Sequence, residues 1–251
     1  MIKIIKDSGL NKLFGGEFEL IHNGFSAGQY NMDFDSERTH AVAEGTALPM
    51  FRFYGWKPWA VSLGYNQKEG QIDLNRCSEK GFDIVRRPTG GRAVLHADEL
   101  TYSVVMNVPQ NLSVQDIYRL IHIVLLQGMR KLGAEGLGFE KAQADLRSFY
   151  QKSAMSVSCF ASSARYEIES DGRKIVGSAQ RLFGKTLLQH GSILLDAGHE
   201  QLSEVATLKT DDERKRLRDF MLSHSISLSD VCNRKIGYDE TVGAMTEAVS
   251  Q

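Results

Sequence analysis

Cys159 and Lys174 are the two residues whose chemical types and closeness in the sequence suggest catalysis. A thiolate is a strong nucleophile, and a nearby amino group can accept the thiol proton or, as an ammonium group, favour the thiolate. The pair predicts covalent catalysis through Cys159, with Lys174 as the proton carrier. Two structural interpretations stay open at this point: a cysteine packed in the core and a lysine exposed at a turn.

The dipeptide Asp171-Gly172 predicts the turn of a β-hairpin that positions Lys174. Polar and apolar residues alternate on both sides of the turn, so Lys174 is expected to begin the second strand. Because side chains alternate across a strand, Lys174 would share one face with Val176 and Ser178, and Gly177 would lie on the other face. The pattern allows either face to point inward.

His96 and His190 are alternative partners for the Cys159 thiol, because histidine activates cysteines more often than lysine does. The spacing of the two histidines from Cys159 in the sequence rules out neither of them as its partner. The seven histidines form no HExxH or HxxxH pattern, so no catalytic metal is predicted. Cys77 and Cys232 complete the set of three cysteines, which contains no CxxC pair. This argues against a disulfide framework or a structural zinc site and favours the reducing cytoplasm.

A glycine-containing loop, Arg86-Arg-Pro-Thr-Gly-Gly-Arg-Ala-Val94, lies between two predicted strands. The Walker loop and the Rossmann fingerprint both place phosphate at the start of a following helix, and no helix is expected here. Gly90 and Gly91 would let the backbone approach a ligand closely, and Arg87 and Arg92 would meet a carboxylate or phosphate. A plain turn with solvated arginines is the competing interpretation.

The composition is that of a globular protein with a sizeable core. At 251 residues and 28.0 kDa, with 42% hydrophobic and 24% charged residues, we predict a single domain over 1–251, its C-terminal segment from about 200 being helical. A net charge of −1 and a pI near 6.7 argue against nucleic acid as the main partner. The sequence shows no apolar run of membrane-spanning length, no signal-peptide pattern and no association helix, so a cytoplasmic monomer is expected.

The elements that must position these residues are several short strands and one long helix. Ser113 and Asp116 form the pattern of a capping box, and apolar residues then recur at helical spacing up to Leu132. Asn23-Gly24 predicts a turn, and the runs on either side of Ala97-Asp-Glu99 predict a hairpin. Further strands are expected at 17–22, 51–56, 60–65, 82–86, 186–190 and 192–195, helices at 30–45, 211–218, 225–230 and 239–251, and a weakly structured connection at 133–158.

The ordered motifs resemble the lipoate-protein ligase and octanoyltransferase superfamily, which is related in fold to biotin protein ligase. The resemblance covers nearly the whole chain and rests on Asn31-Met32, Phe51–Trp56, Ala60–Gly64, Arg86–His96, Lys174–Gln180 and Leu188–Ile193. Cys159-Phe, followed by Tyr-Glu-Ile and Lys174-Ile-Val-Gly-Ser-Ala-Gln, is similar to the bacterial branch that transfers octanoyl through an acyl-cysteine without ATP.

The resemblance implies an α+β fold in which a large and a smaller mixed sheet frame an acyl tunnel, with helices packed outside. It implies transfer of octanoyl from acyl carrier protein, through a Cys159 thioester, to the lipoyl-accepting lysine of a lipoyl domain or glycine-cleavage H protein. Lys174 would be the proton shuttle, and no cofactor would be needed. The residues implied in substrate binding are Arg87, Gly90, Gly91, Arg92, His96, Gly177 and Ser178.

An ATP-dependent lipoate-protein ligase is the main alternative. The glycine loop and Lys174 would then hold lipoyl-adenylate, ATP and magnesium would be required, and Cys159 would be incidental. Such ligases tend to have Gly-Gly-Gly where this chain has Gly90-Gly91-Arg92, and many carry a further C-terminal domain, which some obtain from a separate polypeptide. A carrier-binding protein without catalysis would have no need of both Cys159 and Lys174, and the adenylate loop of biotin ligases has a different order.

Overall fold

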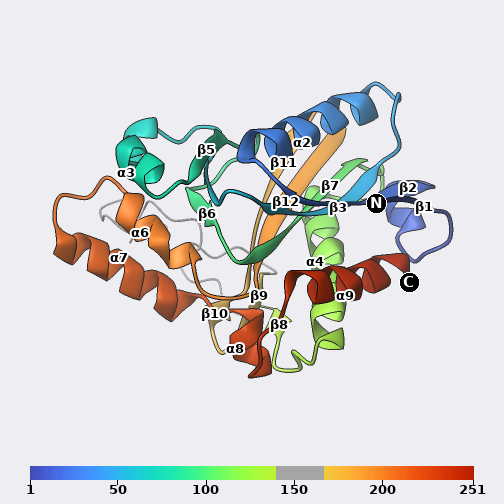
Figure 1. Cartoon of the computed structure of the whole chain (residues 1–251). Helices are drawn as coiled ribbons and strands as arrows, with labels where there is room; N and C mark the ends of the chain where they lie inside the picture. Colours follow the sequence, from blue (N-terminus) through green and yellow to red (C-terminus); the bar gives the residue numbers. More distant parts are fainter. Residues whose placement is uncertain (140–166) are drawn as a thin grey trace.

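A six-stranded β-sheet forms the centre of the computed structural model, which describes residues 1–139 and 167–251. The strand order is β1-β2-β3-β7-β12-β11 (Figure 1). β2 and β3 run parallel, and the other neighbouring strands are antiparallel. The strands are β1 (Ile2–Ile5), β2 (Phe18–Ser26), β3 (Met50–Trp56), β7 (Glu99–Asn107), β11 (Val176–Phe183) and β12 (Thr186–Leu194). The predicted α+β fold with mixed sheets is confirmed.

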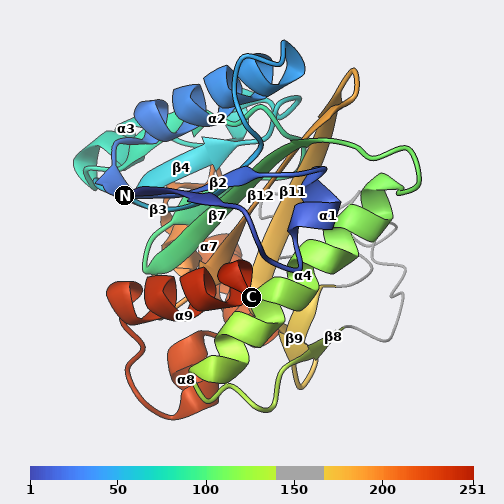
Figure 2. The same ribbon diagram turned by 90° about the vertical axis from the view of Figure 1, so that its right-hand side faces the viewer.

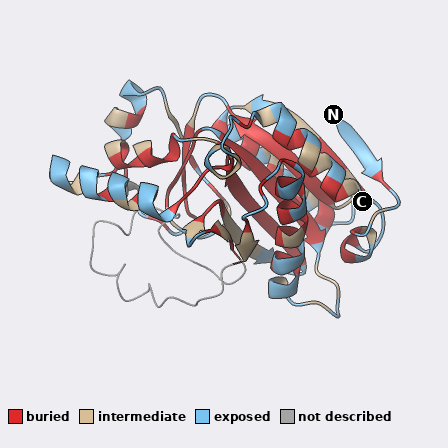
Figure 3. Ribbon diagram, turned by 90° about the horizontal axis from the view of Figure 1, so that it is seen from below, coloured by how far each residue is buried: buried red, intermediate tan, exposed pale blue. Residues whose placement is uncertain are grey.

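Side-chain alternation along β7 separates two layers of the protein. Leu100 and Tyr102 belong to the main apolar core, which also contains residues of α4 (Val114–Lys131) and α9 (Tyr238–Ser250). Ser103 points the other way and donates to Asp35 of α2 (Gly28–Ala43). Figure 2 shows α4 and α9 on one face of the sheet and α2 on the other, and Figure 3 shows the buried residues concentrated in the strands between them.

A smaller sheet of three strands, β5-β4-β6, stands beside the large one. It consists of β4 (Ala60–Leu63), β5 (Asp83–Arg86) and β6 (Val94–His96). Its core includes Cys77 of α3 (Leu74–Glu79), α6 (Leu202–Val205) and α7 (Asp211–His224). The large sheet and this smaller sheet agree with the two mixed sheets that the family resemblance implies.

The hairpin predicted at Asp171-Gly172 is present, between β9 (Ile168–Ser170) and β10 (Arg173–Lys174). Both turn residues have positive φ angles, 50° and 74°, as this turn type requires. β9 also pairs with β8 (Gly138–Phe139) in a third sheet. Lys174 lies in the second strand, but the strand is short: after Ile175 the chain passes into β11 of the large sheet.

Two sequence predictions about turns are wrong. Asn23-Gly24 lies inside β2, where the pairing with β3 shifts register, and the positive φ of Gly24 accommodates this irregularity. The predicted hairpin around Ala97-Asp-Glu99 does not form, because β6 pairs with β4 of the small sheet while β7 pairs with β3 and β12. This short connection carries the chain from one sheet to the other, which places His96 and Glu99 at their junction.

The helix predictions agree with the structure. Ser113 and Asp116 form the predicted capping box of α4, and similar boxes begin α7 at Thr210 and α8 (Leu228–Cys232) at Ser227. Other helical segments are α1 (Asn11–Phe14), η1 (Glu69–Gln71) and η4 (His199–Gln201). In the described part of the chain, no helix combines the length and apolar character needed to cross a membrane.

Candidate active site

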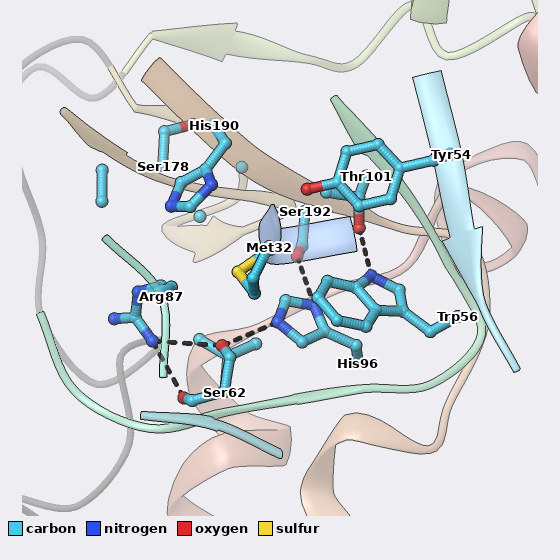
Figure 4. A pocket seen from close by; sticks show the side chains of 14 residues that line it. Met32, Tyr54, Trp56, Ser62, Arg87, His96, Thr101, Ser178, His190 and Ser192 are labelled. Carbon is cyan, nitrogen blue, oxygen red and sulfur yellow. Dashed lines mark hydrogen bonds between the residues drawn. The ribbon is translucent and has the colours of Figure 1, made fainter. Parts of the chain in front are cut away.

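A pocket lies where the large sheet, the small sheet and α2 meet (Figure 4). Four of the predicted substrate-binding residues line it, namely Arg87, His96, Gly177 and Ser178. The remaining lining residues are Met32 of α2, Tyr54 and Trp56 of β3, Ser62 of β4, Val94 of β6, Thr101 of β7, Ala179 of β11, and His190, Gly191 and Ser192 of β12.

The polar lining follows from strand periodicity. On β12, His190 and Ser192 lie on the pocket side, and they pair with Ala179 and Gly177 of β11. The intervening Gly191 is packed so closely that a Cβ at this position would collide with the Gly177 carbonyl oxygen. Alternation and a glycine contact therefore bring β11 and β12 together at the pocket wall.

His96 is the centre of a buried hydrogen-bond network at the pocket. Its Nδ1 lies 2.7 Å from Glu99 Oε1, and its Nε2 lies 2.8 Å from Ser62 Oγ. The Glu99 carboxylate fixes the proton of a neutral imidazole on Nδ1, which leaves Nε2 to accept from the Ser62 hydroxyl. Thr101 and Ser192 also donate to Glu99 Oε1. The network holds the imidazole in one orientation beside the pocket.

Trp56 fixes the same imidazole from its face. The two rings stack with centroids 3.9 Å apart and an interplanar angle of 12°, and the indole N–H of Trp56 donates to Thr101 Oγ1 across 2.7 Å. Because Thr101 in turn donates to Glu99, the indole is linked to the same carboxylate that holds His96. Figure 4 shows Trp56 stacked on His96 and its hydrogen bond to Thr101.

Arg87 shapes the glycine loop. Its Nη1 donates to the backbone and hydroxyl oxygens of Ser62, and its Nε and Nη2 donate to the carbonyl of Gly90. Nη2 also donates to the carbonyl of Arg92 at 2.6 Å. These bonds engage all five guanidinium donors. Arg87 therefore braces the loop, and direct contact with a substrate stays a prediction.

The predicted residues Gly90, Gly91 and Arg92 lie on that loop, outside the set that lines the pocket. Gly91 has a φ of 101°, a conformation that favours glycine. Its carbonyl packs against Gly64 so tightly that a Cβ on Gly64 would overlap it. The backbone geometry therefore requires glycine at both Gly64 and Gly91, independently of any ligand of the loop.

Asp35 and Arg52 form a fully buried ion pair behind the pocket, 2.8 Å apart. Burial alone would raise the pKa of Asp35, but Arg52 and the donors around the carboxylate outweigh burial and lower it. His190 lies 3.6 Å from Asp35, and its Nε2 is 2.6 Å from Thr89 Oγ1 of the glycine loop. Burial lowers the pKa of His190. The cluster connects α2 through β12 to the loop.

Lys174, predicted as a catalytic residue, is buried rather than exposed at its turn. Its Nζ is 2.7 Å from Glu167 Oε2, and both side chains are almost inaccessible to solvent. Ser178 places its hydroxyl 2.7 Å from Tyr102 Oη and 2.9 Å from His122 Nε2. Cys159 lies outside the described residues, so its position relative to Lys174 is a prediction.

Sequence reasoning missed Glu99, Asp35, Arg52 and Glu167 as parts of the site. One signal was available: Arg52 is a charged residue within an otherwise apolar strand, and such a residue needs a buried partner. The main partner of Glu99 is His96, which lies in another sheet, and the main partners of Asp35 lie far away in the sequence. A local sequence pattern does not reveal such contacts. Within residues 1–139 and 167–251, no group of three His, Cys, Asp or Glu residues is arranged to hold a metal ion.

Comparison with known proteins identifies the family. Residues 27–250 match the model of the lipoyl protein ligase A/B catalytic domain. The chain belongs to this family. Octanoyltransferase LipM of Kyrpidia tusciae is 38% identical, over 93% of this chain and 86% of that protein. Octanoyltransferase LipM of Staphylococcus aureus is 35% identical, over 92% and 83%. Membership of this family and these relatives make the chain a transferase enzyme, as predicted.

Solved structures confirm the fold. A bipartite lipoate protein ligase from Thermoplasma acidophilum, described with its E2 lipoyl domain, superposes with a TM-score of 0.69 at 20% identity, over 92% of this chain and 81% of that one. Lipoate-protein ligase A bound with ATP gives a TM-score of 0.67 at 21% identity, over 92% and 83%. At these identities the likeness concerns the fold.

Proposed function

We propose that the chain is an octanoyltransferase of lipoate biosynthesis. In this proposal it moves octanoyl from acyl carrier protein, through a thioester on Cys159, to the lipoyl-accepting lysine of a lipoyl domain or glycine-cleavage H protein. The observation that carries the proposal is the identity of 35–38% to proteins named octanoyltransferase LipM, over more than nine-tenths of the chain. The lipoyl domain described with the Thermoplasma ligase supports a carrier domain as the acceptor.

The reaction has two acyl-transfer steps. The Cys159 thiol gives its proton to Lys174, and the thiolate attacks the octanoyl thioester. The carrier thiolate leaves and takes the proton back from Lys174. The acceptor lysine then attacks the acyl-cysteine and loses a proton to Lys174, which returns that proton to the departing Cys159 thiolate. These two steps account for every proton and every acyl bond, and they use no ATP, metal or cofactor.

The pocket is the proposed place for the acyl chain. Met32, Val94 and Ala179 provide apolar lining, and Gly177 and Gly191 add no side chain to the wall that β11 and β12 form. The His96 and Arg87 hydrogen bonds to Ser62 hold the wall of the small sheet in place. Lys174 is buried in an ion pair with Glu167, and the strand that follows it carries Gly177 of the pocket wall, which supports its assignment as the proton carrier.

Intact-protein mass spectrometry tests the proposal. The wild type and Cys159→Ser are incubated with octanoyl-acyl carrier protein without ATP, and an apo lipoyl domain is then added. We expect a hydroxylamine-labile octanoyl adduct on the wild type alone, and its transfer to the lipoyl domain. Modification that requires ATP, magnesium and free octanoate or lipoate, with no adduct on Cys159, would instead assign an ATP-dependent ligase.

A further inference from the structure

Glu167, one residue before β9, is a buried partner of Lys174. The two residues lie on the two arms of the short hairpin, whose register pairs Lys174 with Glu169 and Arg173 with Ser170. Lys174 Nζ reaches past Glu169 to Glu167 Oε2, 2.7 Å away. The hairpin turn at Asp171-Gly172 therefore determines which carboxylate the amine meets.

Both members of this ion pair are removed from water. Lys174 is 7% exposed and Glu167 is 4% exposed, whereas Glu169 is half-buried. A buried ammonium group carries a large desolvation cost, which a carboxylate at ion-pair distance offsets. Lys215 and Asp219, by contrast, form an exposed pair, in which both charges stay hydrated and no desolvation cost has to be offset.

We propose that Glu167 is a positioning residue for catalysis, which holds Lys174 and compensates its charge when the amine takes the thiol proton. This inference rests on the proposed function, because it assigns Lys174 as the proton carrier. The ion pair corresponds to the state in which the Cys159 thiol proton is already on Lys174 Nζ, so that the sulfur is a thiolate and the lysine an ammonium group. The lysine becomes a neutral amine when it gives this proton to the departing carrier thiolate, and an ammonium group again when it takes the proton of the acceptor lysine. The carboxylate of Glu167 stays ionised, provides the opposite charge and keeps Nζ in one place. No proton is transferred to Glu167 in this step.

Backbone contacts around the pair make the position of Lys174 rigid. The Lys174 carbonyl accepts from the N–H of Ile226, which follows α7, and Ile175 N–H donates to the Ile168 carbonyl of β9. Leu194 N–H of β12 donates to the Ile175 carbonyl. Three separate elements thus fix the backbone at 174–175, and Glu167 fixes the end of the side chain. Gly177 of the pocket wall follows within the next strand.

The test compares three variants in single-turnover formation of the Cys159 octanoyl thioester. Glu167→Gln keeps the shape of the side chain and removes its charge, and Glu167→Asp keeps the charge on a shorter side chain. Asp219→Asn removes a carboxylate from the exposed pair with Lys215 and is the control. We expect Glu167→Gln to slow thioester formation by about a hundredfold, because Nζ is no longer held in place. Glu167→Asp should lose less, and Asp219→Asn should remain within about twofold of the wild type.

A kinetic readout separates positioning from a general structural effect. The loss in Glu167→Gln should appear in kcat, with the KM for octanoyl-acyl carrier protein little changed, and circular dichroism should show a folded protein. If Glu167→Gln does not fold, Glu167→Asp carries the test, with a lower kcat and an unchanged KM expected. A folded Glu167→Gln with the wild-type rate would overturn the inference. Absence of the adduct on the wild type would instead overturn the proposed function.

Discussion

The imidazole of His96 is held by the carboxylate of Glu99, with 2.7 Å between Nδ1 and Oε1, at the point where the chain passes from the small sheet to the large one. His96 ends β6 of the small sheet, and Glu99 begins β7 of the large sheet. This hydrogen bond between close neighbours in the sequence therefore helps to join the two walls of the pocket, together with the stacking of Trp56 on His96. Its loss should affect both the folded state and the site.

Glu99→Gln tests this junction. The amide keeps an acceptor oxygen but loses the negative charge that strengthens the hydrogen bonds from His96, Thr101 and Ser192, all of which meet Oε1. We expect the free energy of unfolding to fall by about 1–3 kcal/mol. Octanoyl transfer should also fall, because the orientation of His96 beside the pocket is less well fixed.

The control for Glu99→Gln is Glu247→Gln, which removes a carboxylate from an exposed pair with Lys131. Urea unfolding should place this control within about 0.5 kcal/mol of the wild type. Equal effects of the two substitutions would show that the buried network does not stabilise the junction.

The Asp35–Arg52 pair should show strong coupling in a double-mutant cycle. Arg52→Met leaves a carboxylate buried without its cation, and Asp35→Leu leaves the guanidinium without its anion. Each single substitution is expected to lower the free energy of unfolding by about 3–5 kcal/mol. The double substitution should cost less than the sum of the two, because no lone charge is left in the interior. Additive losses in denaturant unfolding would contradict this expectation.

Parts of the fold could be predicted from the sequence because their signals are local. The capping box of α4 and the turn at Asp171-Gly172 depend on adjacent residues, and both are present. The prediction of a hairpin around Ala97-Asp-Glu99 is wrong because a short polar connection between strands has the same local pattern whether or not the strands pair. Pairing is decided by β3 and β4, which lie far away in the sequence.

The same physical reason explains which site residues the sequence revealed. His96 and Gly177 belong to short motifs, and both line the pocket. Lys174 was predicted for its type and its turn, but its partner Glu167 was not, because the register of a two-residue strand decides which carboxylate it meets. The contact between Asp35 and His190 joins a helix to a distant strand, and no residue spacing in the sequence predicts this contact.

The free energy of unfolding should rise with pH from the lowered folded-state pKa of His190 up to its ordinary value of 6.5. Burial lowers the pKa of His190 below its ordinary value of 6.5, and burial lowers the pKa of His199 in the same way. Between the folded and unfolded pKa values, the unfolded state binds more protons than the folded state. Raising the pH through 6.5 therefore removes a penalty on folding, with a slope of about 1.4 kcal/mol per pH unit for each such histidine.

Urea unfolding of the wild type and His190→Gln at a series of pH values measures this effect. The variant should have a shallower dependence on pH near 6, because one of the histidines that resist protonation is gone. Asp35 contributes in the same direction at lower pH: its lowered pKa gives stability that is lost as the pH falls through the folded value. An unchanged slope in His190→Gln would show that His190 does not contribute.

The three cysteines should differ in their reactivity toward iodoacetamide. Cys77 is fully buried in the core of the small sheet, and burial raises its pKa to about 11. Burial also raises the pKa of Cys232, whose Sγ contacts the Leu132 carbonyl oxygen. Only the thiolate reacts readily, so neither residue should be labelled quickly near pH 7.

If Cys159 is the nucleophile, peptide mapping after a short exposure to iodoacetamide should find the label at Cys159. Octanoyl-acyl carrier protein, added first, should prevent that labelling, because the thioester occupies the same sulfur. Rapid labelling of Cys77 in the folded protein, or equal labelling of all three thiols, would contradict this distinction.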